Sequence, residues 1–389
     1  MGQADAVTAP AHRVPAEWEP HDGTIVCWPA RDELWGSLRD RAVEDHAALV
    51  AAVARFEPVI VVADPRQAEE AERMCARPAS PETLCPPGGS THDRSPRTTP
   101  HPVSVRELPI DDSWARDTGP LGALRPDGSR IVVGVSFNGW GSRYEPHEDD
   151  AALGRRWAQQ AGEPYVTVDG IDVDGRPVPF VFEGGSVTVD GLGTVVTTEQ
   201  CLRHPNRNPS MSTEALESAL HRTLGTTTAV WLPHGLALDR DTDGHVDNVA
   251  AFIAPGLVLA QGCDDPCEAD HDRLADDLAV LTAAHDATGE RIRAIEVPVL
   301  PFAEVGGRRV AVPYLNLYLC NGGAVVPLSG HPADDDMLAL IGSHLPGRTV
   351  VGVPGAVLAF GGGGPHCTTQ QIPRRSQSTG ADPEDLSCA

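Results

Sequence analysis

Apolar and polar positions along the chain repeat in a three-part unit. Its clearest copy predicts an apolar hairpin over residues 181–198 that turns at Asp190-Gly191. A helix over 212–224 follows, with Ser212 and Gly225 as its expected caps, and then a strand over 229–232. The same order of hairpin, helix and strand recurs at 246–261, 266–287 and 295–300, and again at 309–327, 333–344 and 349–353.

Two more units complete the pattern. One joins a hairpin over 114–137 to a helix near 150–160 and a strand over 165–168. The other forms only if residues 356–372 pair with residues 22–28, before a helix over 34–54 and a strand over 58–62. The pattern therefore predicts one α/β domain over 1–373, a closed ring of five units that the two chain ends seal. An open doubly wound α/β sheet is the alternative, although no GxGxxG follows the early strands and hairpins require antiparallel pairing.

Two segments lie outside the repeating units. Residues 77–102 are rich in Pro, Ser and Thr and are expected to form a surface insertion, and residues 374–389 a disordered tail. Residues 1–14 lack the apolar segment of a secretion signal, and no apolar run approaches the roughly 18 residues of a membrane span. We therefore expect a cytoplasmic protein with no membrane partner, in which the nine scattered cysteines are reduced.

The chain is strongly acidic, with 30 basic and 55 acidic residues and a formal net charge of −25 at pH 7. This excess argues against nucleic acid, which proteins bind through many phosphate contacts, and favours a cationic small molecule as the partner. All 30 basic residues are Arg, so the chain contains no Lys. Enzymes that need a particular lysine amine, such as pyridoxal-phosphate enzymes, Walker-type ATPases and kinases, are therefore excluded.

Candidate chemical groups occur where the predicted hairpins begin. Each has an ordinary structural alternative, such as a turn cap for an aspartate or an inert core position for a cysteine. Their equivalent positions in different units favour a functional role over a structural one, because the equivalent ends of successive units would meet at the axis of a ring. The candidates are Asp117, Glu183, His245, Asp247 and Cys367.

Together these residue types fit chemistry on a guanidinium. A cysteine beside a histidine gives an activated thiolate, and two carboxylates can hold a planar cation by paired hydrogen bonds. At an effective dielectric constant of about 20, each close carboxylate contributes roughly 4 kcal/mol of Coulomb attraction before desolvation. The thiolate can add to the central carbon and expel ammonia, which leaves an amidino-thioether for water to hydrolyse. A metal site is the rival use of these side chains, but the HxxxH and CxxC spacings are missing.

A series of short motifs spans most of the chain. In order, they are PAEWEPH at 15–21, SWARDTGP at 113–120, FNGWG at 137–141, EGGS at 183–186, NRNP at 206–209, DGHVDN at 243–248, YLN at 314–316, NGG at 321–323 and HCTTQQ at 366–371. In these motifs the chain resembles the agmatine deiminases of the guanidino-group-modifying (pentein) superfamily, which are related to the bacterial-type peptidyl-arginine deiminases. The resemblance implies a five-fold pseudo-symmetric α/β propeller and cofactor-free conversion of agmatine into N-carbamoylputrescine and ammonia.

The resemblance also implies a role for each candidate residue. It makes Cys367 the nucleophile and His245 the acid and base. Asp117 and Asp247 would clamp the guanidinium, and Glu183 would support His245 or the substrate. It implies no metal.

The substrate is the most open part of this prediction. Trp18 and Trp140 are expected in the pocket, whereas Arg116 and Arg143 offer no clear pair for a carboxylate, because an Arg beside a clamp aspartate is more often a structural ion pair. Agmatine is therefore expected to be preferred to arginine. Departures from the family pattern at 313 and 364–365 leave another guanidine in a specialised pathway as an alternative. An amidinotransferase, a peptidyl-arginine deiminase and a silent guanidine-binding protein are further alternatives, and a homo-oligomer is left open.

Overall fold

Five sheets repeat one strand arrangement in this computed structural model, which describes residues 11–77 and 100–376. In each sheet an antiparallel pair is extended by a strand that pairs in parallel after a helical connection. This is the three-part unit that the sequence predicts. The antiparallel pairs show that the alternative, one doubly wound parallel sheet, is wrong.

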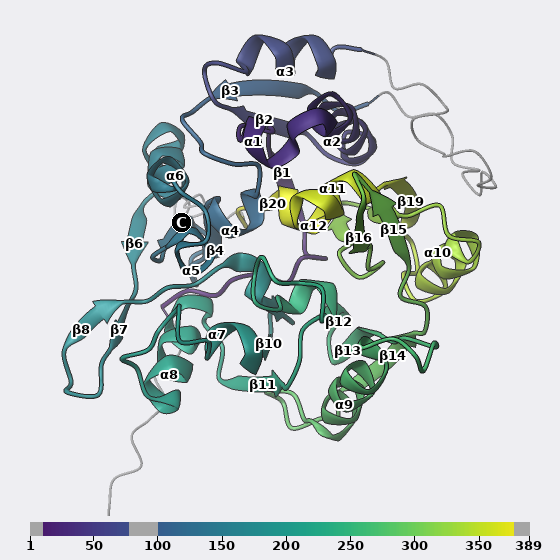
Figure 1. The fold of residues 1–389 in the computed structure, drawn as a ribbon. Coiled ribbons are helices and arrows are strands. Elements are labelled where there is room, and N and C mark those ends of the chain that lie inside the picture. Colours follow the sequence, from purple (N-terminus) through teal and green to yellow (C-terminus); the bar gives the residue numbers. More distant parts are fainter. Residues whose placement is uncertain (1–10, 78–99, 377–389) are drawn as a thin grey trace, which may run out of the picture.

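Four of these sheets have three strands. In chain order they contain β4 (Leu121–Leu124), β5 (Arg130–Gly134) and β6 (Tyr165–Thr167); β9 (Val187–Val189), β10 (Thr194–Thr198) and β11 (Thr228–Leu232); β12 (Ala250–Ala254), β13 (Leu257–Gln261) and β14 (Arg293–Val297); and β17 (Tyr318–Cys320), β18 (Gly323–Leu328) and β19 (Thr349–Pro354). Their long helices lie toward the outside in Figure 1 and are α6 (Glu148–Ala161), α8 (Thr213–Leu224), α9 (Asp270–Ala283) and α10 (Asp334–Ser343). The predicted caps of α8 are confirmed, because the Ser212 side chain accepts a hydrogen bond from the backbone N–H of Ala215 and Gly225 is left-handed.

The two ends of the described chain meet in the fifth sheet. β20 (Thr369–Pro373) pairs antiparallel with β1 (His21–Cys27), as predicted. The pairing is shorter than expected, because residues 356–368 form α11 (Ala356–Gly361) and α12 (Pro365–Thr368) rather than a strand. The other elements of this unit are α1 (Asp32–Trp35), the 3-10 helix η1 (Gly36–Leu38), α2 (Arg39–Val53), β2 (Val59–Ala63), α3 (Ala68–Cys75) and β3 (Val103–Glu107).

Two other predicted elements differ from the structure. The helix expected over 34–54 is divided at Gly36 into α1, η1 and α2. The segment expected to form one hairpin over 309–327 instead holds β17 and most of β18, which form one hairpin, and most of β16 (Arg308–Ala311), which pairs with the earlier strand β15 (Phe302–Val305). Gly306 and Gly307 both have positive φ, 58° and 77°, which suits a two-residue turn between those strands. The remaining small hairpin joins β7 (Asp169–Ile171) to β8 (Pro177–Pro179).

Apolar side chains are buried between each sheet and its helix. In α8, Leu216, Leu220 and Leu224 recur every fourth residue, so they share the face that packs on Val195 of β10. In Figure 1 the short helices α4 (Ala115–Thr118) and α12 lie nearer the middle of the molecule than these outer helices. Segments that precede the first strands of the units therefore come together in the interior.

The predicted insertion and tail lie mostly outside the described residues, which omit 78–99 and 377–389. None of the helices in the described ranges is long and apolar enough to cross a membrane. The seven cysteines within these ranges are free, as expected for reduced thiols: Cys27, Cys75, Cys201, Cys263, Cys267, Cys320 and Cys367.

Candidate active site

The predicted site residues occupy the segments that directly precede the first strands. Asp117 is on α4 before β4, and Cys367 is on α12 before β20. Glu183 precedes the 3-10 helix η2 (Gly184–Ser186) before β9. His245 and Asp247 lie at the 3-10 helix η3 (Val246–Asn248) before β12. All five side chains are buried, so the shared position in the repeat does bring these groups into the interior.

Polar groups from two other units lie close to the backbone at Gly185. His245 Nδ1, Asp117 Oδ1 and Asp247 Oδ2 all lie within 3.0 Å of the position that a Cβ on Gly185 would take. Only a glycine lets these groups come so near, because any Cβ would overlap them. The two carboxylates that meet here are of the kind that can hold a planar cation with several N–H groups.

His245 is held by charge rather than by direct hydrogen bonds. Its Nδ1 lies 3.9 Å from Asp117 Oδ1 and its Nε2 lies 3.7 Å from Glu183 Oε2. Neither ring nitrogen has a hydrogen-bond partner among the described residues. Burial opposes a charged ring, but Asp117 and then Cys201 and Glu183 outweigh it, so the pKa of His245 is well above its usual value. The ring is therefore a proton donor in the unliganded site.

Asp117 is oriented by two donors. Its Oδ1 accepts a hydrogen bond from the Gly185 N–H and its Oδ2 one from Trp140 Nε1, each at 2.9 Å. Trp140 has φ 53°, a conformation that is costly for a bulky side chain. Burial raises the pKa of Asp117 although His245 opposes the shift, and Glu183 raises it further. A bound cation would offset this unfavourable burial of charge.

Glu183 lies behind His245 and is paired with a buried arginine. Arg207 Nε donates to Glu183 Oε1 at 2.7 Å, and both side chains are fully buried. Glu183, Cys201 and His245 place possible metal-ligand atoms within 4.8 Å of one another. Arg207 disfavours a metal there, because its guanidinium already neutralises Glu183 and would repel a second cation.

Within the described residues, the Cys367 sulfur contacts an amide and a carboxylate and makes no direct contact with a cation. Its Sγ lies 3.1 Å from Asn316 Nδ2 and 3.3 Å from Asp247 Oδ2. Burial raises the pKa of the Cys367 thiol well above its usual value, and Asp247 and Asp117 raise it further. This direction of the pKa favours the neutral thiol over the thiolate in the unliganded site, whereas the sequence pattern led us to expect an activated thiolate.

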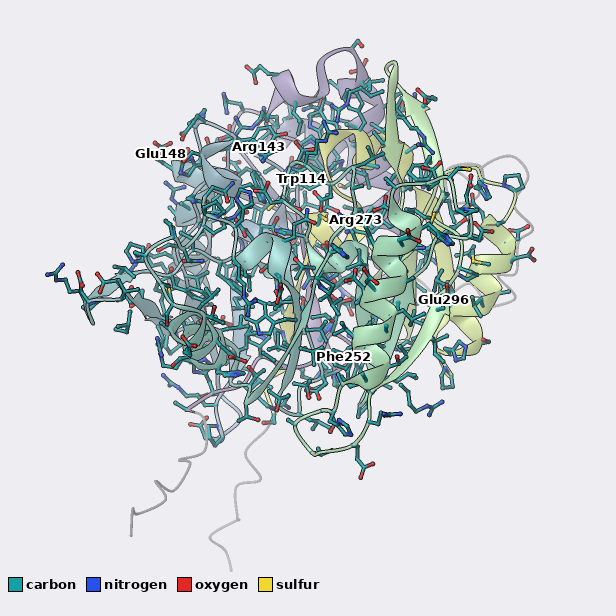
Figure 2. The ribbon with its side chains drawn as sticks, turned by 60° about the horizontal axis from the view of Figure 1, so that its bottom comes forward. Trp114, Arg143, Glu148, Phe252, Arg273 and Glu296 are labelled. Atoms are coloured by element: carbon teal, nitrogen blue, oxygen red, sulfur yellow. The ribbon has the colours of Figure 1, made fainter. Side chains whose placement is uncertain are left out.

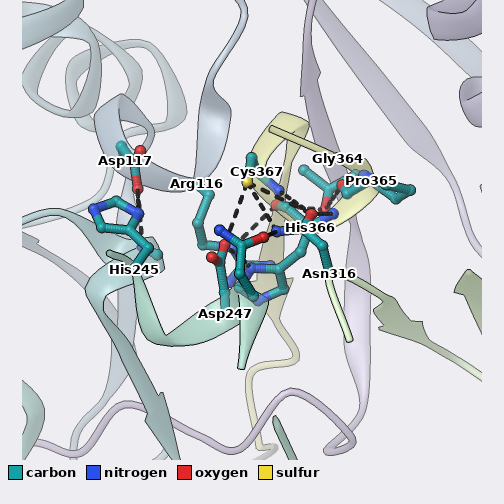
Figure 3. A network of polar contacts seen from close by, with 12 residues as sticks. Arg116, Asp117, His245, Asp247, Asn316, Gly364, Pro365, His366 and Cys367 are labelled. Atoms are coloured by element: carbon teal, nitrogen blue, oxygen red, sulfur yellow. Dashed lines mark hydrogen bonds and ion pairs between the residues drawn. The ribbon is translucent and has the colours of Figure 1, made fainter. Parts of the chain in front are cut away.

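Asp247 connects the thiol to a second histidine, as Figure 3 shows. Asp247 Oδ2 accepts a hydrogen bond from His366 Nδ1 at 2.9 Å, whereas the buried Oδ1 has no partner among the described residues. His366 Nε2 in turn faces Glu17, which also pairs with Arg116. Arg116 is thus a buried structural ion pair, as the sequence indicates, and is not free to bind a carboxylate.

A small pocket borders Cys367. It is lined by Trp114, Asp117, Trp140, Tyr144, Asp241, Thr242, Gly361, Gly362 and Cys367. A second pocket also borders Asp117, but neither Cys367 nor His245 is among its lining residues. In Figure 2, Trp114 lies near the middle of the molecule, while Arg143 and Glu148 lie nearer its edge.

The two tryptophans that the sequence places in the pocket have different positions. Trp140 lines the pocket. Trp18 does not, because its half-buried side chain packs against two core clusters and its carbonyl accepts a hydrogen bond from Arg348 Nη2 at 2.7 Å. Arg143 pairs with Asp243 at 2.9 Å.

Comparison with known proteins identifies the family. The model of the Porphyromonas-type peptidyl-arginine deiminase family matches residues 13–373. The chain belongs to this family. An agmatine deiminase of Stutzerimonas stutzeri is 36% identical over 380 residues, which cover 92% of this chain and 95% of that protein. An agmatine deiminase of Pseudomonas putida is 34% identical over 387 residues, which cover 94% and 96%.

Solved structures of the deiminase family share the fold. An agmatine deiminase of Enterococcus faecalis, described as catalysing its reaction, has a TM-score of 0.82 at 28% identity. The match covers 95% of this chain and 99% of that chain. The resemblance that the motifs indicate is therefore confirmed over nearly the whole chain.

Three residues of this deiminase site were not among the predicted ones. Asn316 donates to the Cys367 sulfur, His366 binds Asp247, and Arg207 binds Glu183. All three lie within motifs on which the family resemblance rests, so the sequence could have marked them as candidates. It could not have shown which residues they contact. Asn316 also occupies the same place in its unit as the predicted residues, two positions before β17.

Proposed function

We propose that this deiminase hydrolyses the guanidinium of agmatine to N-carbamoylputrescine and ammonia through a covalent adduct on Cys367. The observation that carries the proposal is that Asp117 and Cys367 line one pocket, with Asp247 Oδ2 3.3 Å from the Cys367 sulfur. A cation held by the two carboxylates in that pocket lies near the thiol. The agmatine deiminases at 34% and 36% identity over most of their length support the same reaction.

The two aspartates act as the guanidinium clamp in this proposal. Asp247 Oδ1 is buried and unpartnered among the described residues, so it is free to accept a guanidinium N–H. Asp117 belongs to another unit and lines the same pocket as Cys367. At an effective dielectric constant of about 20, a carboxylate about 4 Å from a cation contributes roughly 4 kcal/mol, which favours a guanidinium over a neutral amide.

The reaction needs a nucleophile and a proton donor, and the site supplies both. When the guanidinium binds, the Cys367 thiol releases its proton to solvent, and the sulfur attacks the guanidinium carbon and forms a C–S bond. The adduct collapses when one C–N bond breaks, and protonated His245 gives the leaving nitrogen the proton that it needs to depart as ammonia. Water, deprotonated by the now neutral His245, attacks the amidino-thioether. The C–S bond then breaks while the hydroxyl proton of the adduct passes to the departing sulfur, which releases the product with an uncharged ureido group and restores the thiol.

The lining of the pocket favours a substrate with a second cation. Asp241 lies on it and accepts a hydrogen bond from the Tyr144 hydroxyl at 2.8 Å through Oδ1. No basic side chain is among the lining residues that the structure describes. The ammonium of agmatine suits this lining better than the carboxylate of arginine, which would approach Asp241 and Asp117 without a partner.

We also propose that the five similar sheets form a five-fold pseudo-symmetric α/β propeller within one catalytic domain, residues 1–373. The support is the common strand order of the five units and their sequence around the molecule in Figure 1. In such a ring the segments before the first strands converge on the axis, which accounts for a site assembled from separate units.

One assay tests the function. Ammonia and ureido product are measured with agmatine, arginine, a peptide with an internal arginine and other guanidines, without an added amine. We expect the highest kcat/KM with agmatine. If only another guanidine yields ureido product, that guanidine is the substrate instead of agmatine. If guanidine is consumed only when an amine is added, the protein is an amidinotransferase. Binding without turnover would indicate a catalytically silent guanidine-binding protein.

A further inference from the structure

His366 is held between two carboxylates beside the nucleophile. Its Nδ1 lies 2.9 Å from Asp247 Oδ2 and its Nε2 lies 3.0 Å from Glu17 Oε2. An ionised carboxylate can only accept hydrogen bonds, so each ring nitrogen must donate one. A histidine that donates from both nitrogens is an imidazolium, and this one carries its charge to within one residue of Cys367.

Glu17 is a fixed anion rather than a mobile surface carboxylate. Its Oε1 accepts a hydrogen bond from the Leu319 N–H and its Oε2 one from Arg116 Nη2, both at 2.7 Å. Burial opposes ionisation of Glu17, but His366 and then Arg116 outweigh it and lower its pKa to about 2. Arg116 is itself held by Gln371 at 2.7 Å. The end of the network away from the nucleophile is therefore rigid and charged.

The other end of the network leaves one oxygen of Asp247 free. Oδ2 is shared between His366 and the Cys367 sulfur, 3.3 Å away. Oδ1 is buried without a partner among the described residues, and a carboxylate so enclosed needs a donor. Because His366 fixes Oδ2, the direction in which Oδ1 points is fixed as well.

We propose that His366 is a positioning residue: as an imidazolium tethered to Glu17, it orients the Asp247 carboxylate so that Oδ1 can receive the guanidinium. The inference rests on the clamp role that the proposed function gives to Asp247. In this proposal, the contacts that run from Arg116 through Glu17 to His366 hold Asp247 Oδ1 in the direction that the substrate requires.

The charged groups around His366 determine its pH range. Burial and the cation of Arg116 oppose protonation, whereas the anions of Glu17 and Asp247 favour it and prevail, so the pKa of His366 lies above its usual 6.5. The imidazolium is therefore present below that raised pKa and is lost as pH rises through it. A neutral ring donates from only one nitrogen, so Asp247 or Glu17 then loses its hydrogen bond. Alkaline pH should loosen the clamp.

The first test compares pH profiles of kcat/KM for agmatine. His366→Leu removes both donors, so we expect a loss of at least about tenfold. His366→Asn can still donate to Asp247 without a charge, and it should recover part of that loss while lacking the alkaline decline. Glu17→Gln removes the anion that favours the imidazolium, so its alkaline decline should move to lower pH. The exposed His285, replaced by Asn, is the matched control and should behave as wild type.

Two results would overturn the proposal. One is His366→Leu with kcat/KM and pH profile close to wild type, and the other is Glu17→Gln with the alkaline decline unmoved. Ring-proton NMR of the unliganded protein, assigned by the signal lost in His366→Asn, gives a second readout. His366 should titrate above 6.5 and at lower pH in Glu17→Gln. If wild type hydrolyses no guanidine, the proposed function fails, whereas the titration still decides whether His366 is the predicted imidazolium.

Discussion

An alanine at position 185 should disable the site without removing any of its polar groups. Its Cβ would lie 2.6 Å from His245 Nδ1 and 3.0 Å from Asp117 Oδ1 and Asp247 Oδ2. Gly185 is not among the residues with positive φ, so alanine can adopt its backbone conformation and the effect is purely steric. The new methyl group would also press on the two carboxylates that form the proposed guanidinium clamp.

The structure sets the size of the expected effect. Ordinary contact begins at 3.4 Å, so the His245 ring must retreat from 2.6 Å by a large part of an ångström. A displacement of about 1 Å in a catalytic group can cost about 10²-fold in rate, or about 2.7 kcal/mol of transition-state stabilisation. Excess volume in a packed interior costs about 1–3 kcal/mol of folding free energy, which a domain of this size can tolerate. We therefore expect a folded protein whose kcat/KM for agmatine falls by about 100-fold.

The assay is ammonia release from agmatine, with circular dichroism and thermal unfolding as checks on the fold. Gly342→Ala is the matched control, because a Cβ at that position of α10 would meet Val350 at an ordinary 3.4 Å and should leave activity unchanged. If Gly185→Ala retained kcat/KM within about threefold of wild type, the present positions of His245 and the two carboxylates would not be required for catalysis, and the reasoning would be refuted.

Three further predictions concern the same groups. Cys367→Ala should abolish turnover while agmatine still binds, and activity above about a hundredth of wild type would point to another nucleophile. Asp117→Asn and Asp247→Asn should each lower kcat/KM by at least about tenfold, roughly 1.4 kcal/mol, and a near-normal Asp247→Asn would show that this residue does not bind the substrate. Because the pKa of Cys367 is raised, alkylation by neutral iodoacetamide should be slow near pH 7 and rise with pH, and equally fast labelling at pH 7 and pH 9, read by peptide mass spectrometry, would contradict a neutral thiol.

The repeating unit of hairpin, helix and strand is enough to predict most of the fold and most of the site residues. Each unit begins with a segment that enters the interior, so residues such as Asp117 and His245 could be grouped by their position in the unit alone. The same rule identifies Asn316, but only if its hairpin is placed correctly. The turn at Gly306-Gly307 belongs to an extra hairpin, and starting the unit there moves Asn316 out of the equivalent position.

Contacts between distant segments could not be predicted in this way. Glu17 and His366 are far apart in the sequence, and their pairing depends on the sheet in which β20 meets β1. Trp18 is one residue from Glu17, yet it packs into the core rather than the pocket, because neighbouring side chains in an irregular segment have no fixed period. The pKa of a side chain likewise depends on residues that are distant in the sequence. Burial of Cys367 and the nearby Asp247 carboxylate raise the pKa of the thiol, and neither can be inferred from the sequence pattern.

The neutral thiol and the acidic clamp together explain how such a site can select a cation. Burial, Asp247 and Asp117 raise the pKa of Cys367, which favours the thiol over the nucleophilic thiolate while the clamp is empty. A guanidinium about 4 Å away at an effective dielectric constant of about 20 would stabilise the thiolate by roughly 4 kcal/mol, equivalent to about three pKa units. The substrate therefore supplies the charge that forms the nucleophile. The ureido group of the product is uncharged, so its formation removes the guanidinium charge, leaves the two clamp carboxylates without a cation and favours both reprotonation of the thiol and release of the product.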